Sequence, residues 1–130
     1  MILLDTHIWI WWVDENIRLS ARQKQLLEAN KENGLGVSVI SCWEVSKLIA
    51  AQRISFSRPI EEWIRLALAR PHVQLLDFTP QIAIESTQLP GDFHRDPADQ
   101  IIVATARVYD CELITVDAKI LDYPHVKTVK

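Results

Sequence analysis

Short apolar runs alternate with helix-type segments along the whole chain, and this alternation constrains the fold more than any other feature. Between the runs, apolar residues recur with the spacing of amphipathic helices. Alternation of this kind is typical of an α/β domain, with a mainly parallel central sheet of four to five strands and helices on both faces. At 130 residues the chain fits one domain, which we expect to span residues 1–130. The expected strands are residues 2–4, 37–40, 73–78, 113–116 and 126–129.

Residues that commonly cap helices mark where the helices between these strands begin. Proline follows a capping residue at Thr79 and again at Asp96, which is the usual pattern at the first helical position. Gly34 and Gly36 are expected to end the helix that begins at Ser20. We expect helices to start at Asp5 or Thr6, Ser20, Ser41, Pro59, Thr79 and Asp96, with the second ending near residue 33, the third near 52, the fifth near 90 and the sixth near 109.

Composition and charge exclude several classes of protein. No run of about 18 apolar residues occurs, so we expect no membrane-spanning helix. The first residues reach Asp5 without a basic segment, unlike a signal peptide, and Cys42 and Cys111 match no metal-binding spacing. We therefore expect a cytoplasmic protein with two reduced thiols. The net charge of −3 argues against a generic basic nucleic-acid binder, although this argument weakens if several acids lie on a metal.

Acidic residues cluster just before the largely apolar run of residues 101–106. Asp92, Asp96 and Asp99 fall within eight consecutive positions. We interpret Asp92 as a loop residue and Asp96, which precedes a proline, as the cap of the next helix. Asp99 then lies on the first turn of that helix, where the helix dipole favours its ionised form. The cap fixes where the helix starts and therefore where Asp99 points.

Asp99 is one of four acids that the expected topology brings to one edge of the sheet. Asp5 directly follows the first strand and Asp117 the fourth, while Glu44 comes just after the second, on the first turn of the third helix. Ligands of parallel α/β sheets bind beyond the carboxyl ends of the strands, where these acids fall. Taken singly the acids fit local roles, namely an N-cap at Asp5, a turn at Asp117 and a capping box begun by Ser41. Independent caps have no reason to gather at one edge, so we interpret the four acids as one site.

Clustered carboxylates need either a cation or raised pKa values. Two like charges about 4 Å apart repel by about 4 kcal/mol at an effective dielectric constant near 20. Oxygen ligands without His or Cys favour Mg²⁺ or Mn²⁺, and an ion held in this way commonly serves displacement at phosphorus. No Gly-rich phosphate-binding loop is present, which leaves a nuclease or a phosphatase.

Three further residues accompany the acids in the sequence. Thr115 lies two residues before the last acid, and it either holds a metal-bound water or packs as an ordinary strand residue. His94 and Arg95 lie in the loop that enters the last long helix. They either contact RNA phosphate or are solvated loop charges.

Four segments of the chain, residues 3–7, 38–44, 94–106 and 113–117, together resemble the PIN domain family. The match is closest to the VapC-type ribonuclease toxins of bacterial toxin–antitoxin pairs, and it covers essentially the whole chain. The resemblance implies a Mg²⁺- or Mn²⁺-dependent endoribonuclease that forms a homodimer and is silenced by a cognate antitoxin. It assigns the metal and catalytic roles to Asp5, Glu44, Asp99 and Asp117, with Asp96 and Thr115 as accessory groups.

Two other functions stay open at the level of sequence. A phosphatase or phosphotransfer domain would use Asp5 as an aspartyl-phosphate nucleophile, but a haloacid-dehalogenase-type enzyme needs an acid two residues later, where His7 stands. A PIN-like module that binds RNA or a partner without cleavage is the second. The tryptophans Trp9, Trp12 and Trp63 either pack in the core or form an apolar patch for a second subunit or the antitoxin.

Overall fold

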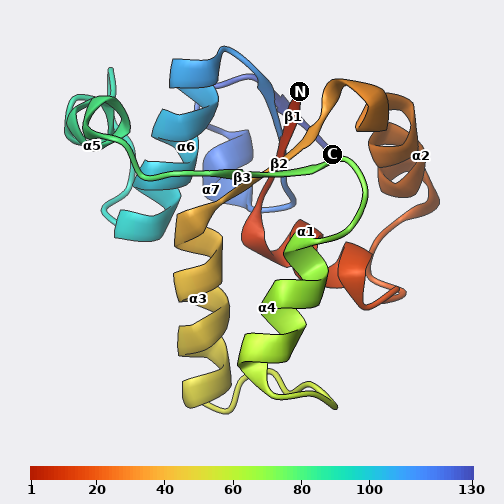
Figure 1. Cartoon of the computed structure of the whole chain (residues 1–130). Coiled ribbons are helices and arrows are strands. Elements are labelled where there is room, and N and C mark those ends of the chain that lie inside the picture. The colour runs from red at the N-terminus through yellow and green to blue at the C-terminus, as the bar shows by residue number, and fades with distance from the viewer.

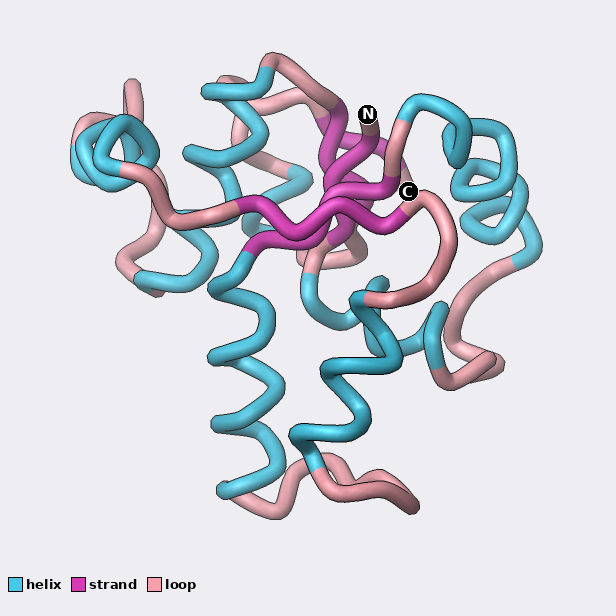
Figure 2. Tube along the Cα trace, in the orientation of Figure 1, coloured by secondary structure: helices cyan, strands magenta, loops and turns pink.

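The computed structural model describes residues 1–130 and contains one five-stranded sheet between two layers of helices (Figure 1, Figure 2). Every neighbouring pair of strands is parallel, and β1 lies in the middle. The predicted fold class is therefore confirmed. The strands, in the order β3-β2-β1-β4-β5, are β1 (Ile2–Leu4), β2 (Leu35–Ser38), β3 (Val73–Leu76), β4 (Glu112–Ile114) and β5 (Thr128–Val129).

Seven α-helices connect and cover these strands. Asp5, Ser20, Thr79 and Asp96 are N-caps whose side chains accept a hydrogen bond from a backbone N–H, as the sequence predicts. Pro59 occupies the cap position of its helix rather than the first helical position. The helices are α1 (Thr6–Val13), α2 (Ala21–Asn30), α3 (Val39–Ala50), α4 (Ile60–Leu68), α5 (Pro80–Thr87), α6 (Pro97–Tyr109) and α7 (Ala118–Leu121).

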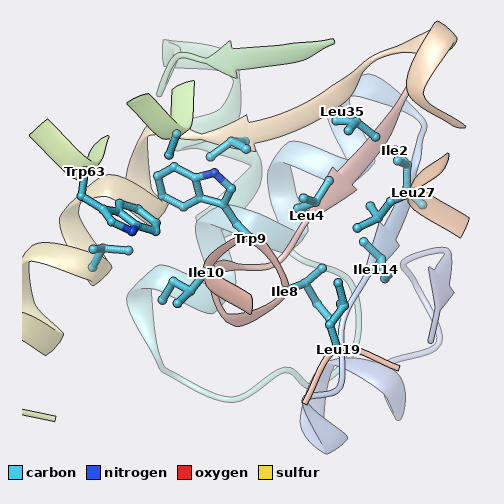
Figure 3. Close-up of a cluster of buried hydrophobic side chains, with 13 residues drawn as sticks. Ile2, Leu4, Ile8, Trp9, Ile10, Leu19, Leu27, Leu35, Trp63 and Ile114 are labelled. Atoms are coloured by element: carbon cyan, nitrogen blue, oxygen red, sulfur yellow. The ribbon is translucent and has the colours of Figure 1, made fainter. Parts of the chain in front are cut away.

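The side chains of β1 alternate between the two faces of the sheet and so belong to two separate cores. Ile2 and Leu4 pack with residues of α1, α2 and α4 (Figure 3). Leu3 packs on the opposite face with residues of α6 and α7. Because β1 is buried on both sides, its register is fixed, and the residue that follows it is placed at the middle of the sheet edge.

Two of the tryptophans pack in the first core. Trp9 is fully buried and meets the ring of Trp63 edge to face, with 5.1 Å between the ring centroids. Trp63 stacks on Phe56 at 4.3 Å and donates a hydrogen bond from Nε1 to Asp14. Trp12 is half-buried beneath the guanidinium of Arg70. Core packing thus accounts for Trp9 and Trp63, and a partner-binding role of the partly buried rings stays a prediction.

The second strand and the third helix begin earlier than the sequence predicts. The expected strand at residues 37–40 is instead Leu35–Ser38, and α3 starts at Val39 rather than at Ser41. The reason is that the hydroxyl of Ser38 caps the helix by accepting a hydrogen bond from the backbone N–H of Ile40. Val39 and Ile40, whose β-branched side chains usually favour a strand, therefore lie in the first turn of α3.

Other expected boundaries differ at element ends. Helix α2 ends at Asn30 and continues as a 3₁₀ turn to Gly34, whereas Gly36 lies inside β2 and does not end a helix. A Cβ on Gly36 would come within 3.1 Å of the side chains of Leu76 and Met1, so both would have to shift to admit a larger residue there. The third, fourth and fifth strands are shorter than expected. Helix α5 ends at Thr87, before the end predicted near Pro90, and α7 is a short helix that the sequence did not predict.

No helix of the structure has the length and apolarity that a membrane crossing requires. Cys42 is half-buried and Cys111 is buried, and both are free thiols.

Candidate active site

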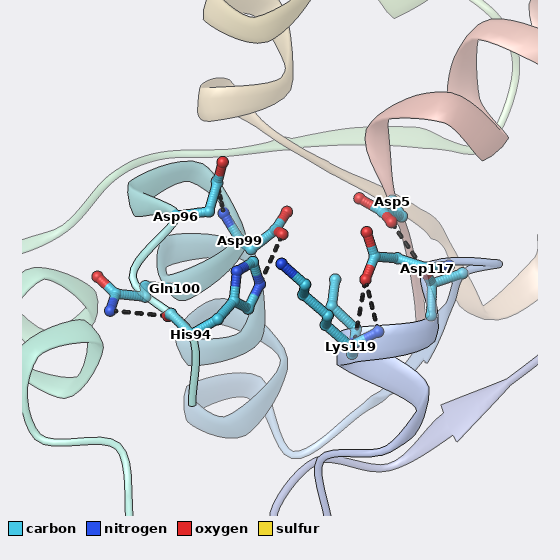
Figure 4. A network of polar contacts seen from close by, with 9 residues as sticks. Asp5, His94, Asp96, Asp99, Gln100, Asp117 and Lys119 are labelled. Carbon is cyan, nitrogen blue, oxygen red and sulfur yellow. Dashed lines mark hydrogen bonds and ion pairs between the residues drawn. The ribbon is translucent and has the colours of Figure 1, made fainter. Parts of the chain in front are cut away.

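The four acids singled out in the sequence line one cavity at the carboxyl edge of the sheet. Its volume is about 240 Å³, and Asp96 lines it as well. Glu44 lies on α3 and Asp99 on α6, whereas Asp5 and Asp117 are the N-caps of α1 and α7. Segments far apart in the chain therefore meet here, as Figure 4 shows for Asp5, Asp99 and Asp117. The structure therefore brings Asp5, Glu44, Asp99 and Asp117 together, as the sequence predicts.

Asp5 is the most buried of the four acids, with 8% of its surface exposed. It leaves the end of β1 as the N-cap of α1, and its Oδ1 accepts a hydrogen bond of 2.8 Å from the backbone N–H of Thr6. Its Oδ2 accepts one of 2.6 Å from the hydroxyl of Thr115. Burial raises the pKa of Asp5, and the two hydrogen bonds oppose that shift by favouring the charged form.

Thr115 is fully buried and links two of the acids. Besides donating to Asp5, its Oγ1 accepts a hydrogen bond of 3.0 Å from the backbone N–H of Asp117. The hydroxyl therefore holds a carboxylate and does more than pack, and a role in holding a metal-bound water stays a prediction. Asp117 is separated from β4 by two residues and caps α7, with Oδ1 accepting from the backbone N–H groups of Lys119 and Ile120. The expected turn is therefore a helix cap.

Glu44 lies on the second turn of α3 and forms no capping box with Ser41. The hydroxyl of Thr6 donates to its Oε1, and because that hydrogen is committed, the hydroxyl of Ser41 donates to Thr6 across 2.8 Å. This relay joins the start of α1 to α3. Burial raises the pKa of Glu44, the bond from Thr6 lowers it, and the charge of Asp5 raises it further. Thr6 and Ser41 are functional neighbours that no local sequence pattern indicated.

Asp99 lies in an environment that disfavours its charged form. It lies on the first turn of α6, and its backbone N–H is capped by Asp96 at 2.9 Å, as predicted. Burial and then the nearby charges, first that of Asp96 and next that of Asp5, raise its pKa from 3.8 to about 7. Only about 16% of its side chain is exposed. A divalent cation bound beside Asp99 would favour its ionised form.

His94 approaches this acid, whereas Arg95 does not. His94 Nε2 lies 2.9 Å from Asp99 Oδ2, but it is out of line for a hydrogen bond and has no other partner although it is buried. The backbone carbonyl of His94 accepts a bond from Gln100. Arg95 is exposed and does not line the cavity. In Figure 4 the side chain of Lys119, which sequence reasoning missed, extends from α7 toward Asp99 and His94.

The donor set fits a hard divalent cation. All of its ligand atoms are carboxylate oxygens, and three of the four acids have raised pKa values that a cation would lower. No three of these side chains come close enough together here to ligate one ion. Mg²⁺ keeps several waters and takes one or two carboxylates directly, so the other acids of the cavity would act on the ion through those waters.

Fold and site together define a class of protein, and comparison with known proteins identifies it. Residues 2–126 match the model of the PIN domain, and the chain belongs to the PIN domain family. Ribonucleases of the VapC group in this family generally depend on a divalent metal.

Individual relatives are consistent with this assignment. The chain is 36% identical over 128 residues to ribonuclease VapC22 of Mycobacterium tuberculosis, covering 98% of this chain and 95% of that protein. A toxin–antitoxin complex from Klebsiella pneumoniae contains a chain that is 25% identical with a TM-score of 0.66, over 100% of this chain and 97% of that one. VapBC2 from Rickettsia felis bound to a promoter DNA fragment shares the fold, with a TM-score of 0.73 and 16% identity over 99% and 98% of the two chains.

Proposed function

We propose that this protein is a metal-dependent endoribonuclease and acts as the toxin of a type II toxin–antitoxin pair. The observation that carries the proposal is the convergence of four carboxylates from distant segments on one cavity. Three of them have pKa values raised by burial and mutual repulsion, a state that a divalent cation relieves. The 36% identity to a protein named as a ribonuclease supports RNA as the substrate.

Asp5, Glu44, Asp99 and Asp117 would hold Mg²⁺ or Mn²⁺. When bound, such an ion orients the scissile phosphate, offsets the charge that develops in the transition state and promotes attack by water. The four acids are therefore the catalytic and metal-binding residues in this proposal.

The neighbouring residues of the chain hold these carboxylates in place. Thr115 fixes one oxygen of Asp5, and Thr6 fixes one oxygen of Glu44, so both hydroxyls select the charged form and its orientation. Asp96 fixes the start of α6 and so aims Asp99 into the cavity. His94 lies beside Asp99, with 2.9 Å between its Nε2 and Oδ2 of that acid, and so borders the place where an RNA phosphate would bind. Arg95 is exposed outside the cavity, and a contact with RNA stays a prediction for it.

RNA cleavage by the purified protein tests the enzymatic part of the proposal. We expect cleavage of single-stranded RNA in Mg²⁺ or Mn²⁺, no cleavage in EDTA, and recovery when excess metal is restored. Asp5→Asn keeps the size of the side chain and is expected to abolish cleavage. The matched control is Asp92→Asn, because Asp92 is an exposed loop acid that lies outside the cavity. Cleavage that persists in EDTA, or in Asp5→Asn, would exclude this mechanism.

A cognate antitoxin is the proposed protein partner. The Klebsiella relative is part of a toxin–antitoxin complex, and the acid cavity is open enough for a partner's side chain to enter. We expect expression of the chain to arrest growth, and co-expression of the protein encoded beside it to restore growth. The homodimer stays a prediction, to be measured by light scattering.

The phosphatase alternative fits this site poorly. An aspartyl-phosphate enzyme of the haloacid-dehalogenase type needs a second acid two residues after the nucleophile, and His7 stands at that position after Asp5. A module that binds RNA without cutting is the remaining alternative. Retained RNA binding without any metal binding would favour it.

A further inference from the structure

A second cavity of about 390 Å³ adjoins the acid cavity between α3 and the start of α6. The two cavities share Glu44 and Asp96. Beyond these two acids, the lining of the second cavity changes sign, because Lys47 and Arg53 line it and do not reach the acid cavity. We call this second cavity the α3 groove. Its charge runs from acidic, where the groove meets the acid cavity, to basic away from it.

An exposed aromatic ring also lines the α3 groove. Trp43 is 46% exposed and is the one tryptophan of the five that is exposed rather than buried or half-buried. Lys47 lies one helical turn later, and its Nζ sits 4.3 Å from the centroid of the Trp43 ring. Lys47 also lowers the pKa of Glu44 by its charge, so one cation reaches both the ring and the acid site. Such a pairing combines a stacking platform and a phosphate-binding charge within one turn of helix.

We propose that the α3 groove is a subsite for single-stranded RNA next to the cleavage site. This inference rests on the proposed function and assigns the path of the substrate beside the scissile bond. One unpaired base stacks on Trp43, and the adjoining phosphates lie against Lys47 and Arg53. The RNA strand then passes over Glu44 and Asp96 into the acid cavity.

Three features favour single-stranded RNA as the occupant of this groove. The indole face accepts any unpaired base, whereas bases of a duplex are not available for stacking. Basic side chains beside an aromatic ring match the alternation of phosphate and base along a single strand. The groove shares Glu44 and Asp96 with the cavity that would hold the scissile phosphate, so a strand bound there adjoins that cavity.

Binding of a short unstructured RNA oligonucleotide, labelled with a fluorophore, tests the subsite. Fluorescence anisotropy is measured in EDTA, so that no cleavage occurs. We expect Trp43→Ala to weaken binding by about fivefold to about 100-fold, which corresponds to the loss of one stacked base. Trp43→Phe keeps a ring and is expected to retain most of the affinity. Phe78→Ala is the matched control, because Phe78 is also 46% exposed and lines neither cavity.

The salt dependence of the same measurement separates stacking from charge. Lys47→Gln is expected to reduce the slope of log affinity against log salt by about 0.7, the value for one phosphate contact on a single strand. Trp43→Ala is expected to leave that slope unchanged. Lys24→Gln, at an exposed lysine outside the α3 groove, controls for loss of general charge. Thermal melting of each variant verifies folding, and photo-crosslinking of thiouridine RNA to the peptide that contains Trp43 reports the contact in the unaltered protein.

The outcomes distinguish this inference from the proposed function. Equal RNA affinity of Trp43→Ala and the wild-type protein, or no RNA binding by the wild-type protein, would overturn the subsite. A loss of antitoxin binding or of self-association in Trp43→Ala, with RNA binding unchanged, would overturn it in favour of a protein interface. RNA binding that depends on Trp43 in a protein that never cleaves RNA would instead retain the subsite and reject the nuclease.

Discussion

Replacing Asp99 by asparagine is expected to stabilise the metal-free protein at neutral and alkaline pH. The reason is that the folded state holds this acid among other carboxylates and raises its pKa from 3.8 to about 7. A carboxyl group with a raised pKa in the folded state binds its proton more tightly than in the unfolded chain. Folding stability therefore falls as pH rises from about 4 to about 7 and stays reduced above that range. Asparagine has the same shape and no charge, so it removes this loss.

The size of the effect follows from the same two pKa values. Their difference corresponds to about 4 kcal/mol at 1.36 kcal/mol per pH unit. Solvent on the open side of the cavity screens part of the repulsion, and we expect about 2 kcal/mol at pH 8. For a domain of this size that is a rise in melting temperature of about 8 °C. Near pH 4 the acid is protonated in the folded state and only about half ionised in the unfolded chain, so the gain should fall to a small fraction of its value at pH 8.

Thermal unfolding of the wild-type protein, Asp99→Asn and the control Asp92→Asn at pH 4 and pH 8 measures the effect. All three are studied in EDTA and again with Mg²⁺. Mg²⁺ should stabilise the wild-type protein, because it binds only the folded state, and should have little effect on Asp99→Asn. If Asp99→Asn is no more stable than the wild-type protein at pH 8, or gains equally at both pH values, the account of the site's electrostatics is wrong.

Three further substitutions test how the site and the core are held. Thr115→Val keeps the shape of a buried residue but removes the hydroxyl that orients Asp5. Calorimetry should show an affinity for Mn²⁺ about 10-fold to 100-fold lower than that of the wild-type protein. Thr105→Val, a buried threonine whose hydroxyl donates within α6, should leave that affinity unchanged. Asp96→Ala should cost about 1 kcal/mol in chemical denaturation through loss of the α6 cap, and Asp96→Asn should restore that stability. Trp63→Ala should cost about 3–5 kcal/mol, and a loss below 1 kcal/mol would contradict its place in the core.

Local signals predicted the part of the site that depends on one segment. The residues from Asp96 to Asp99 combine a cap, a proline and an acid at fixed spacing, so the start of α6 and the position of Asp99 followed from the sequence. The start of α3 did not, because Ser38 and Ser41 are both suitable caps and the β-branched residue Val39 favours a strand. The structure resolves the choice through the hydroxyl of Ser38.

The sequence predicted that the four acids converge, but the hydrogen bonds that hold them between distant segments were beyond the reach of sequence patterns. The relay from Ser41 through Thr6 to Glu44 exists because the start of α1 packs beside α3, across more than 30 residues of chain. The bond from Thr115 to Asp5 depends on the pairing of β4 with β1. The sheet order sets both contacts, and the periodicity of the sequence does not encode that order.

The central claim is that the four acids form one divalent-metal site, and Mn²⁺ binding measured by electron paramagnetic resonance tests it most directly. Free Mn²⁺ gives a signal that disappears on binding, so titration of the metal-free protein counts sites and measures their affinity. The account predicts binding by the wild-type protein that is lost in Asp5→Asn and Asp99→Asn and kept in Asp92→Asn. Undiminished Mn²⁺ binding in both site variants, or RNA cleavage by a protein that binds no Mn²⁺ or Mg²⁺, would contradict it.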